Sequence, residues 1–187
     1  ICSDKTGTLT ENAMTVRALY CGGRHLAVDG HGYNPDGEIR HDETPVAIGG
    51  ALRECLVAGS LCNDASLAKA GHHWTITGDP TEAALIVLAE KGGLRHEHEA
   101  AGAPRLFELP FSSERKRMTS VHLAAGERIA YVKGATEVIL PRTTLTDDQR
   151  RTVAAAEEAM EHDALRVLAV ARRALPADVG NDADAIE

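Results

Sequence analysis

The stretch RLFELPFSSERKRMTSVHLAAGERIAYVK, residues 105–133, decides the fold class. It holds three runs typical of β-strands, at 105–109, 118–124 and 128–133, with only short segments between them. Neighbouring strands that are joined by turns pair in the antiparallel sense. We therefore expect an antiparallel sheet in this half of the chain.

A buried helix is predicted just before this stretch, within TGDPTEAALIVLAEKGG at residues 77–93. Asp79 is placed to cap the helix, Pro80 suits its first position, and Gly92 and Gly93 are typical of its end. Residues 83–89 are apolar nearly all round, which predicts burial on every side.

Further helices and strands are predicted on both sides. Residues 45–62 have helical spacing, and Thr146 and Gln149 form a capping box for a helix that reaches about residue 161. Strands are expected at 14–20 and 165–171, and turn signals at 21–40 indicate hairpins. The pattern predicts an α+β fold, a twisted antiparallel β-sheet flanked by helix pairs.

Composition excludes several classes of protein. The 187 residues allow one domain of generous size, and the net charge of −8 argues against a broad nucleic-acid surface. No apolar run approaches the roughly 20 residues of a membrane span. The cysteines fit neither metal-binding spacing nor a disulfide framework, so we expect reduced thiols at Cys2, Cys21, Cys55 and Cys62.

The amino-terminal segment ICSDKTGTLTEN carries a candidate nucleophile, Asp4. An aspartate can attack a phosphoryl group to form an acyl phosphate, and Lys5 could offset charge on that phosphate. Thr6 supplies a hydroxyl, and Gly7 permits close backbone approach. Such a stretch usually follows a strand of its own, so we expect that the chain is part of a longer protein.

The string DKTGTLT resembles the phosphorylation signature of P-type ATPases, ion pumps that pass through a phospho-aspartate. The resemblance implies that Asp4 is the phosphorylated residue and that Asp4 and Thr6 help to hold Mg²⁺ in the intact parent. Related soluble phosphatases carry a second aspartate at the position of Thr6. A threonine cannot act as a general acid or base there, which favours a longer-lived phospho-enzyme.

Four later segments resemble the nucleotide-binding domain of these pumps, in family order. They are GDPTEAAL (78–85), LPFSSERKRMTSV (109–121), YVKGATEVIL (131–140) and LRVLAVARRAL (165–175). The resemblance implies that adenine stacks on Phe111 and meets Glu82, with Lys133 at the pocket floor. The residues that it assigns to ATP are Asp79, Thr81, Glu82, Phe111, Ser113, Arg115, Lys116, Met118, Lys133, Gly134, Ala135, Arg166 and Leu168.

Four of these residues also have a purely structural interpretation. Glu82 has the spacing of a helix-capping residue, Phe111 could be a core residue, and Lys133 could extend along apolar surface to water. Arg166 could occupy a sheet edge without a ligand. Ser113 stands where calcium pumps often carry an arginine.

The resemblance implies an ATP-binding domain of a type II, calcium-pump-like cation transporter. Residues 1–13 would belong to the phosphorylation domain and hinge, 14–175 to the nucleotide-binding domain, and 176–187 to an acidic linker or tail. The implied partners are ATP or ADP, Mg²⁺, and the phosphorylation, actuator and membrane domains of the parent. We expect a monomeric cytoplasmic fragment that binds nucleotide without efficient hydrolysis.

Two other functions fit parts of the sequence. One is a soluble phosphatase-like enzyme of the same superfamily, which Thr6 opposes. The other is a stand-alone nucleotide-sensing module, which would have no use for DKTGTLT.

Overall fold

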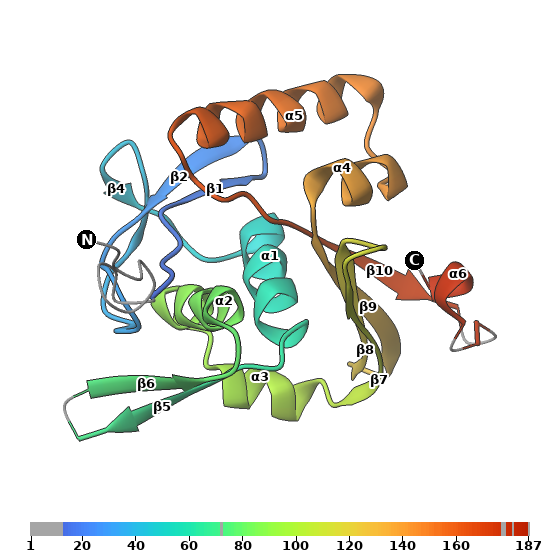
Figure 1. The fold of residues 1–187 in the computed structure, drawn as a ribbon, viewed down its shortest axis with the longest axis horizontal. Coiled ribbons are helices and arrows are strands. Elements are labelled where there is room, and N and C mark those ends of the chain that lie inside the picture. Colours follow the sequence, from blue (N-terminus) through green and yellow to red (C-terminus); the bar gives the residue numbers. More distant parts are fainter. Residues whose placement is uncertain (1–12, 72, 177–178, 181, 187) are drawn as a thin grey trace, which may run out of the picture.

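The computed structural model describes residues 13–71, 73–176, 179–180 and 182–186. Helix α1 (Gly50–Leu61) lies at the centre of the molecule, between two four-stranded sheets (Figure 1). One side of α1 contacts the first sheet through Leu52 and Leu56, and the other contacts the second sheet through Val57 and Leu61. Every strand pair described is antiparallel, so the predicted α+β class is confirmed.

The first sheet follows the order of the sequence. It contains β1 (Ala18–Cys21), β2 (Arg24–Val28), β3 (Ile39–His41) and β4 (Thr44–Pro45). The turn between β1 and β2 uses Gly22 and Gly23, whose φ angles of 60° and 76° favour glycine. Because Thr44–Pro45 pairs as a strand, α1 begins at Gly50 and not at residue 45 as the spacing suggested.

The second sheet has the order β10-β9-β8-β7 and contains the three strands predicted first. They are β7 (Arg105–Ser112), β8 (Arg117–Ala124) and β9 (Glu127–Gly134), and β10 (Ala169–Leu175) is the fourth strand. The predicted start of β10 at residue 165 is wrong. Ala169 pairs with Gly134, the last residue of β9, so residues 165–168 have no neighbouring strand to pair with.

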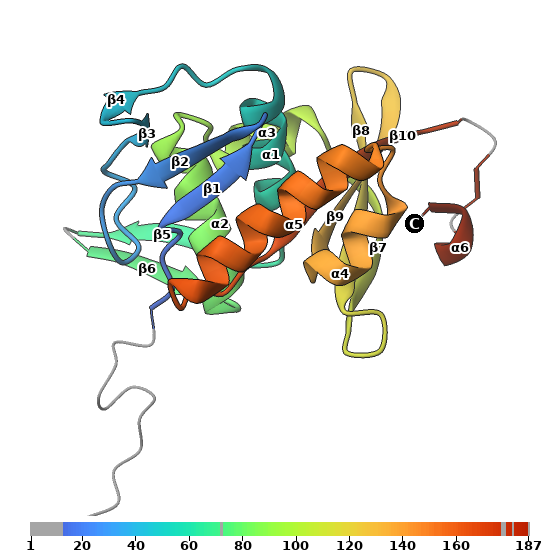
Figure 2. The same ribbon diagram turned by 90° about the horizontal axis from the view of Figure 1, so that it is seen from above.

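Two helices begin and end close to their predicted bounds. Helix α2 (Pro80–Lys91) is capped by the Asp79 side chain, and residues 83–89 are buried except for the half-buried Leu85. Helix α5 (Asp147–His162) begins with the complete Thr146–Gln149 capping box and crosses the body in Figure 2.

Several short elements were not predicted. The hairpin of β5 (Ser66–Ala70) and β6 (His73–Thr77) extends from the body in Figure 1. The others are the helices α3 (His96–Gly102) and α4 (Thr136–Ile139), the 3-10 turn Leu140–Arg142, and α6 (Ala183–Ile186). None of the described helices has the length and apolar content that a membrane span requires.

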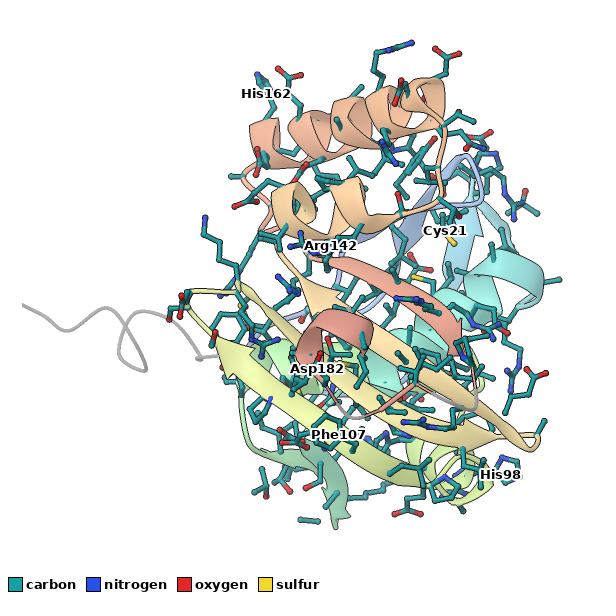
Figure 3. All side chains as sticks on the ribbon, turned by 90° about the vertical axis from the view of Figure 1, so that its right-hand side faces the viewer. Cys21, His98, Phe107, Arg142, His162 and Asp182 are labelled. Atoms are coloured by element: carbon teal, nitrogen blue, oxygen red, sulfur yellow. The ribbon has the colours of Figure 1, made fainter. Side chains whose placement is uncertain are left out.

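Helix α6 belongs to the segment 176–187, which was expected to be an acidic linker or tail. Its Ile186 is 1% exposed and packs with Val121, Ala130 and Leu175. Figure 3 looks onto the face of the second sheet on which α6 lies. Val179 packs against the same cluster, so two apolar side chains hold this part of the acidic segment on the sheet.

Candidate functional site

The amino end of α2 is fixed by Asp79. Its carboxylate accepts hydrogen bonds from the backbone N–H groups of Thr81, at 2.7 Å, and Glu82, at 3.2 Å. Burial works against the charged form of Asp79. The Thr81 hydroxyl, these N–H groups and the charge of Arg166 outweigh that effect, so the pKa of Asp79 lies below its ordinary value.

Glu82, in the first turn of α2, forms an ion pair with Lys133 near the end of β9. Their Oε1 and Nζ atoms are 2.5 Å apart, and the side chains are 17% and 9% exposed. The other carboxylate oxygen of Glu82 accepts the backbone N–H of Asp64 at 3.1 Å. Glu82 thus connects α2 to the second sheet and to the loop after α1.

Three of the four predicted nucleotide segments meet at one end of the second sheet. Ser112 pairs with Arg117, Arg117 with Gly134, and Gly134 with Ala169, which makes one row across all four strands. The Glu82–Lys133 pair adds the fourth segment to the same end of the sheet. The tertiary structure therefore brings together residues from positions 82 to 169.

Phe111 lies beside this row and is 62% exposed. The β7–β8 register shifts between Leu109 and Ser112, where Pro110 occupies an edge strand that tolerates the missing N–H. The other phenylalanine, Phe107, is half-buried and packs against the cluster that contains Ile186. The core interpretation thus fits Phe107 and not Phe111.

The turn after Phe111 holds three predicted contacts, Ser113, Arg115 and Lys116. The Arg115 guanidinium donates to the carbonyl of Pro110. Lys116 has a φ of 50° and forms an exposed ion pair with Glu137 at 2.9 Å. The Arg115 guanidinium therefore contacts the residue directly before Phe111, whereas the Lys116 ammonium pairs with Glu137 of α4.

Two predicted contacts, Met118 and Gly134, have evident structural roles. Met118 is 1% exposed, pairs across the strands with Lys133 and belongs to the core against α1. A Cβ on Gly134 would lie 2.3 Å from the carbonyl oxygen of Lys116, so glycine is required by the neighbouring strand itself. The next residue, Ala135, donates its N–H to that oxygen at 3.1 Å.

Arg166 and Leu168 precede β10 and line a cavity of about 1010 Å³ between α5, β1, α1 and residues 164–172. Thr81 also lines it. Glu82, Phe111 and Lys133, all described residues, lie outside this lining. The predicted residues therefore divide between the end of the second sheet and the edge of this cavity.

The predicted catalytic and metal residues Asp4, Lys5 and Thr6 lie outside the described residues. Two residues that were not predicted from the sequence, Asn63 and Asp64, contact Glu82 directly. In the sequence they are a polar pair directly after a predicted helix. Such a pair predicts a loop, but it does not indicate which residue the loop contacts.

An antiparallel α+β domain that carries these four segments in this order is typical of the nucleotide-binding domain of P-type ATPases. The family described as P-type ATPase, cytoplasmic domain N, matches residues 51–187, and the chain belongs to this family.

The relatives agree with this assignment. The chain is 43% identical over 188 residues to cation-transporting ATPase pma1 of Synechocystis, covering 92% of this chain and 21% of the relative. It is 36% identical over 193 residues to a calcium-transporting ATPase of Bacillus subtilis, covering 95% of this chain and 21% of the relative. It is 39% identical over 188 residues to the human calcium-transporting ATPase type 2C member 1, covering 91% of this chain and 20% of the relative. The predicted family resemblance is confirmed, and the chain spans about a fifth of these relatives.

Proposed function

We propose that this chain is the ATP-binding domain of a cation-transporting P-type ATPase and that it presents ATP to Asp4. The observation that carries the proposal is that the largely buried Glu82–Lys133 pair and the exposed Phe111 lie at the same end of the second sheet, where the four predicted segments meet. A mostly exposed phenylalanine with cationic neighbours suits a purine and its phosphates.

In this proposal each side chain has a separate role. The adenine ring stacks on Phe111, its amino group donates to Glu82, and Lys133 closes the pocket floor. Arg166 is the candidate for the phosphates, because it lies near enough to the capped end of α2 to lower the pKa of Asp79. Met118 supports Lys133 from the core.

The chemical step belongs to the intact parent, a membrane protein whose cytoplasmic part would include this domain. A carboxylate oxygen of Asp4 forms a bond to the γ-phosphorus, and the bond to the bridging oxygen breaks, so ADP leaves with that electron pair. Lys5 and Thr6 would stabilise the transferred group, and Asp4 and Thr6 would help to hold Mg²⁺, which would offset negative charge there. The isolated chain would bind nucleotide without efficient hydrolysis, because this step requires an in-line arrangement that further domains complete.

Titration calorimetry with ATP and ADP, each with and without Mg²⁺, tests the binding role. We expect similar, modest affinities for both nucleotides and little dependence on Mg²⁺, since the base and Lys133 provide most of the contacts. Failure of both nucleotides to bind would contradict the proposal. A strict Mg²⁺ requirement would show that metal ligands dominate instead.

A further inference from the structure

The loop after α1 is built around the buried side chain of Asn63, which is 3% exposed. Its amide nitrogen donates to the carbonyls of Gly59, at 3.2 Å, and Glu82, at 2.8 Å. Its amide oxygen accepts the N–H of Ala65 at 2.9 Å. Asn63 therefore ties the end of α1 to the first turn of α2.

The same loop also contacts the Glu82 carboxylate. The backbone N–H of Asp64 donates to one oxygen, and Lys133 contacts the other. A carboxylate held at both oxygens by groups from different elements cannot rotate without losing a hydrogen bond.

Arg105 holds this loop from the side of the second sheet. Its guanidinium donates to the carbonyls of Leu61 and Asn63 and pairs with the carboxylates of Asp64 and Glu108. On the other side of the loop, a Cβ on Gly78 would lie 2.9 Å from the Cα of Ala65. The loop is therefore packed on two sides.

We propose that Asn63, the Asp64 N–H and Arg105 form a positioning unit that orients Glu82 and so sets the choice of purine base. This inference rests on the proposed function, in which Glu82 faces the base. Adenine carries an amino donor at position 6, where hypoxanthine carries an oxygen acceptor. A fixed carboxylate accepts from the amino group and repels the oxygen, whereas a carboxylate free to turn can adapt to hypoxanthine.

The test compares the affinities of the whole chain for ATP and inosine triphosphate by calorimetry. We expect the unaltered chain to prefer ATP by about tenfold or more, and Asn63→Ser to lose most of that preference. Asn34→Ser is the matched control, because Asn34 is exposed and its side chain bonds to Asp36 in its own loop, far from Glu82 in the sequence. Its preference should equal that of the unaltered chain.

A second variant, Arg105→Lys, keeps the charge but removes the guanidinium group whose several N–H donors hold the loop. It should lower the preference for ATP by a smaller factor. If Asn63→Ser does not fold, the preference of Arg105→Lys for ATP over inosine triphosphate tests the inference on its own. Amide hydrogen exchange at Asp64 in the unaltered chain is an independent readout, expected to be slow and to slow further with ATP. Fast exchange there overturns the inference.

The outcomes separate this inference from the proposed function. Folded variants that bind both nucleotides more weakly, with the preference unchanged, would give Asn63 and Arg105 a merely structural role. If Glu82→Gln leaves the preference intact while ATP still binds, base selection does not pass through Glu82. The inference then fails together with the role of Glu82 at the base, while the proposal that the chain binds ATP stands. If the unaltered chain binds neither nucleotide, the proposed function fails.

Discussion

Glu82 and Lys133 are 51 residues apart in the sequence, yet their side chains form an ion pair of 2.5 Å from which water is largely excluded. Each charge is costly to bury alone, and the pair offsets this cost only while both members are present. The pair therefore links the stability of the domain to its proposed nucleotide site.

Removing one member of the pair should cost more than removing both. Lys133→Met leaves the Glu82 carboxylate buried without its cation, and we expect a loss of about 3 kcal/mol in the free energy of unfolding. The double variant with Glu82→Gln should recover part of that loss. Urea unfolding of the two single variants and the double variant measures the coupling. Additive losses would show that the two charges are solvated independently.

The two phenylalanines should respond in opposite ways. Phe111→Ala should weaken ATP binding by roughly 1–3 kcal/mol, the scale of a lost base–aromatic stack, with little effect on unfolding because the ring is mostly exposed. Phe107→Ala, the matched control, should lower stability by about 1–3 kcal/mol, because it opens the cluster under α6 and removes a half-buried ring. Calorimetry and urea unfolding of both variants check this. Loss of cooperative unfolding in Phe111→Ala would make that ring a core residue.

Local signals in the sequence predicted much of the fold. The Asp79 cap and the Thr146–Gln149 capping box work within one turn of helix, so the residues themselves carry the information. The strands of the 105–133 stretch were equally readable, because apolar and β-branched residues recur in short runs between turns. The candidate residues Glu82, Phe111 and Lys133 followed from the family resemblance.

Features that depend on distant partners were not predictable. The start of β10 depends on where β9 ends, which residues 165–168 do not encode. The contacts of Asn63 and Asp64 with Glu82 require α1 and α2 to pack first. The burial of Ile186 likewise depends on an apolar patch made by β8, β9 and β10.

Thr136, the first residue of α4, is a site where proline should stabilise the chain. Its hydroxyl is buried and has no hydrogen-bond partner in the described part of the chain. Ala135 before it has φ −67° and ψ 136°, the conformation that precedes proline readily. We expect Thr136→Pro to raise the melting temperature by about 2–4 °C. In contrast, Thr152→Pro within α5 should lower the melting temperature. A lower melting temperature for Thr136→Pro would contradict the prediction and would reveal a hydrogen bond of Thr136.

Cys21 should be the most reactive of the described thiols. A hydrogen bond from the Cys55 thiol, opposed by burial and aided by the charge of Arg24, lowers the pKa of Cys21 from 9.0 to about 7. Because the thiolate is the nucleophile, alkylation of Cys21 by iodoacetamide should accelerate as the pH rises through about 7. Burial raises the pKa of Cys62, which should label slowly.

A pair of variants at Cys55 tests the cause of this reactivity. Cys55→Ser keeps a hydrogen-bond donor and should leave the alkylation midpoint low. Cys55→Ala removes the donor and should move the midpoint toward 9.0, the ordinary value. Midpoints that stay near 7 in both variants would assign the shift to Arg24 instead.

The most direct test of the account is the change in backbone amide chemical shifts when ADP is added to the isotope-labelled chain. We expect the largest changes at Glu82, Phe111 and Gly134, around the end of the second sheet. Changes confined to the 1010 Å³ cavity beneath α5, at residues such as Tyr20, Val153 and Met160, would place the nucleotide elsewhere and contradict it.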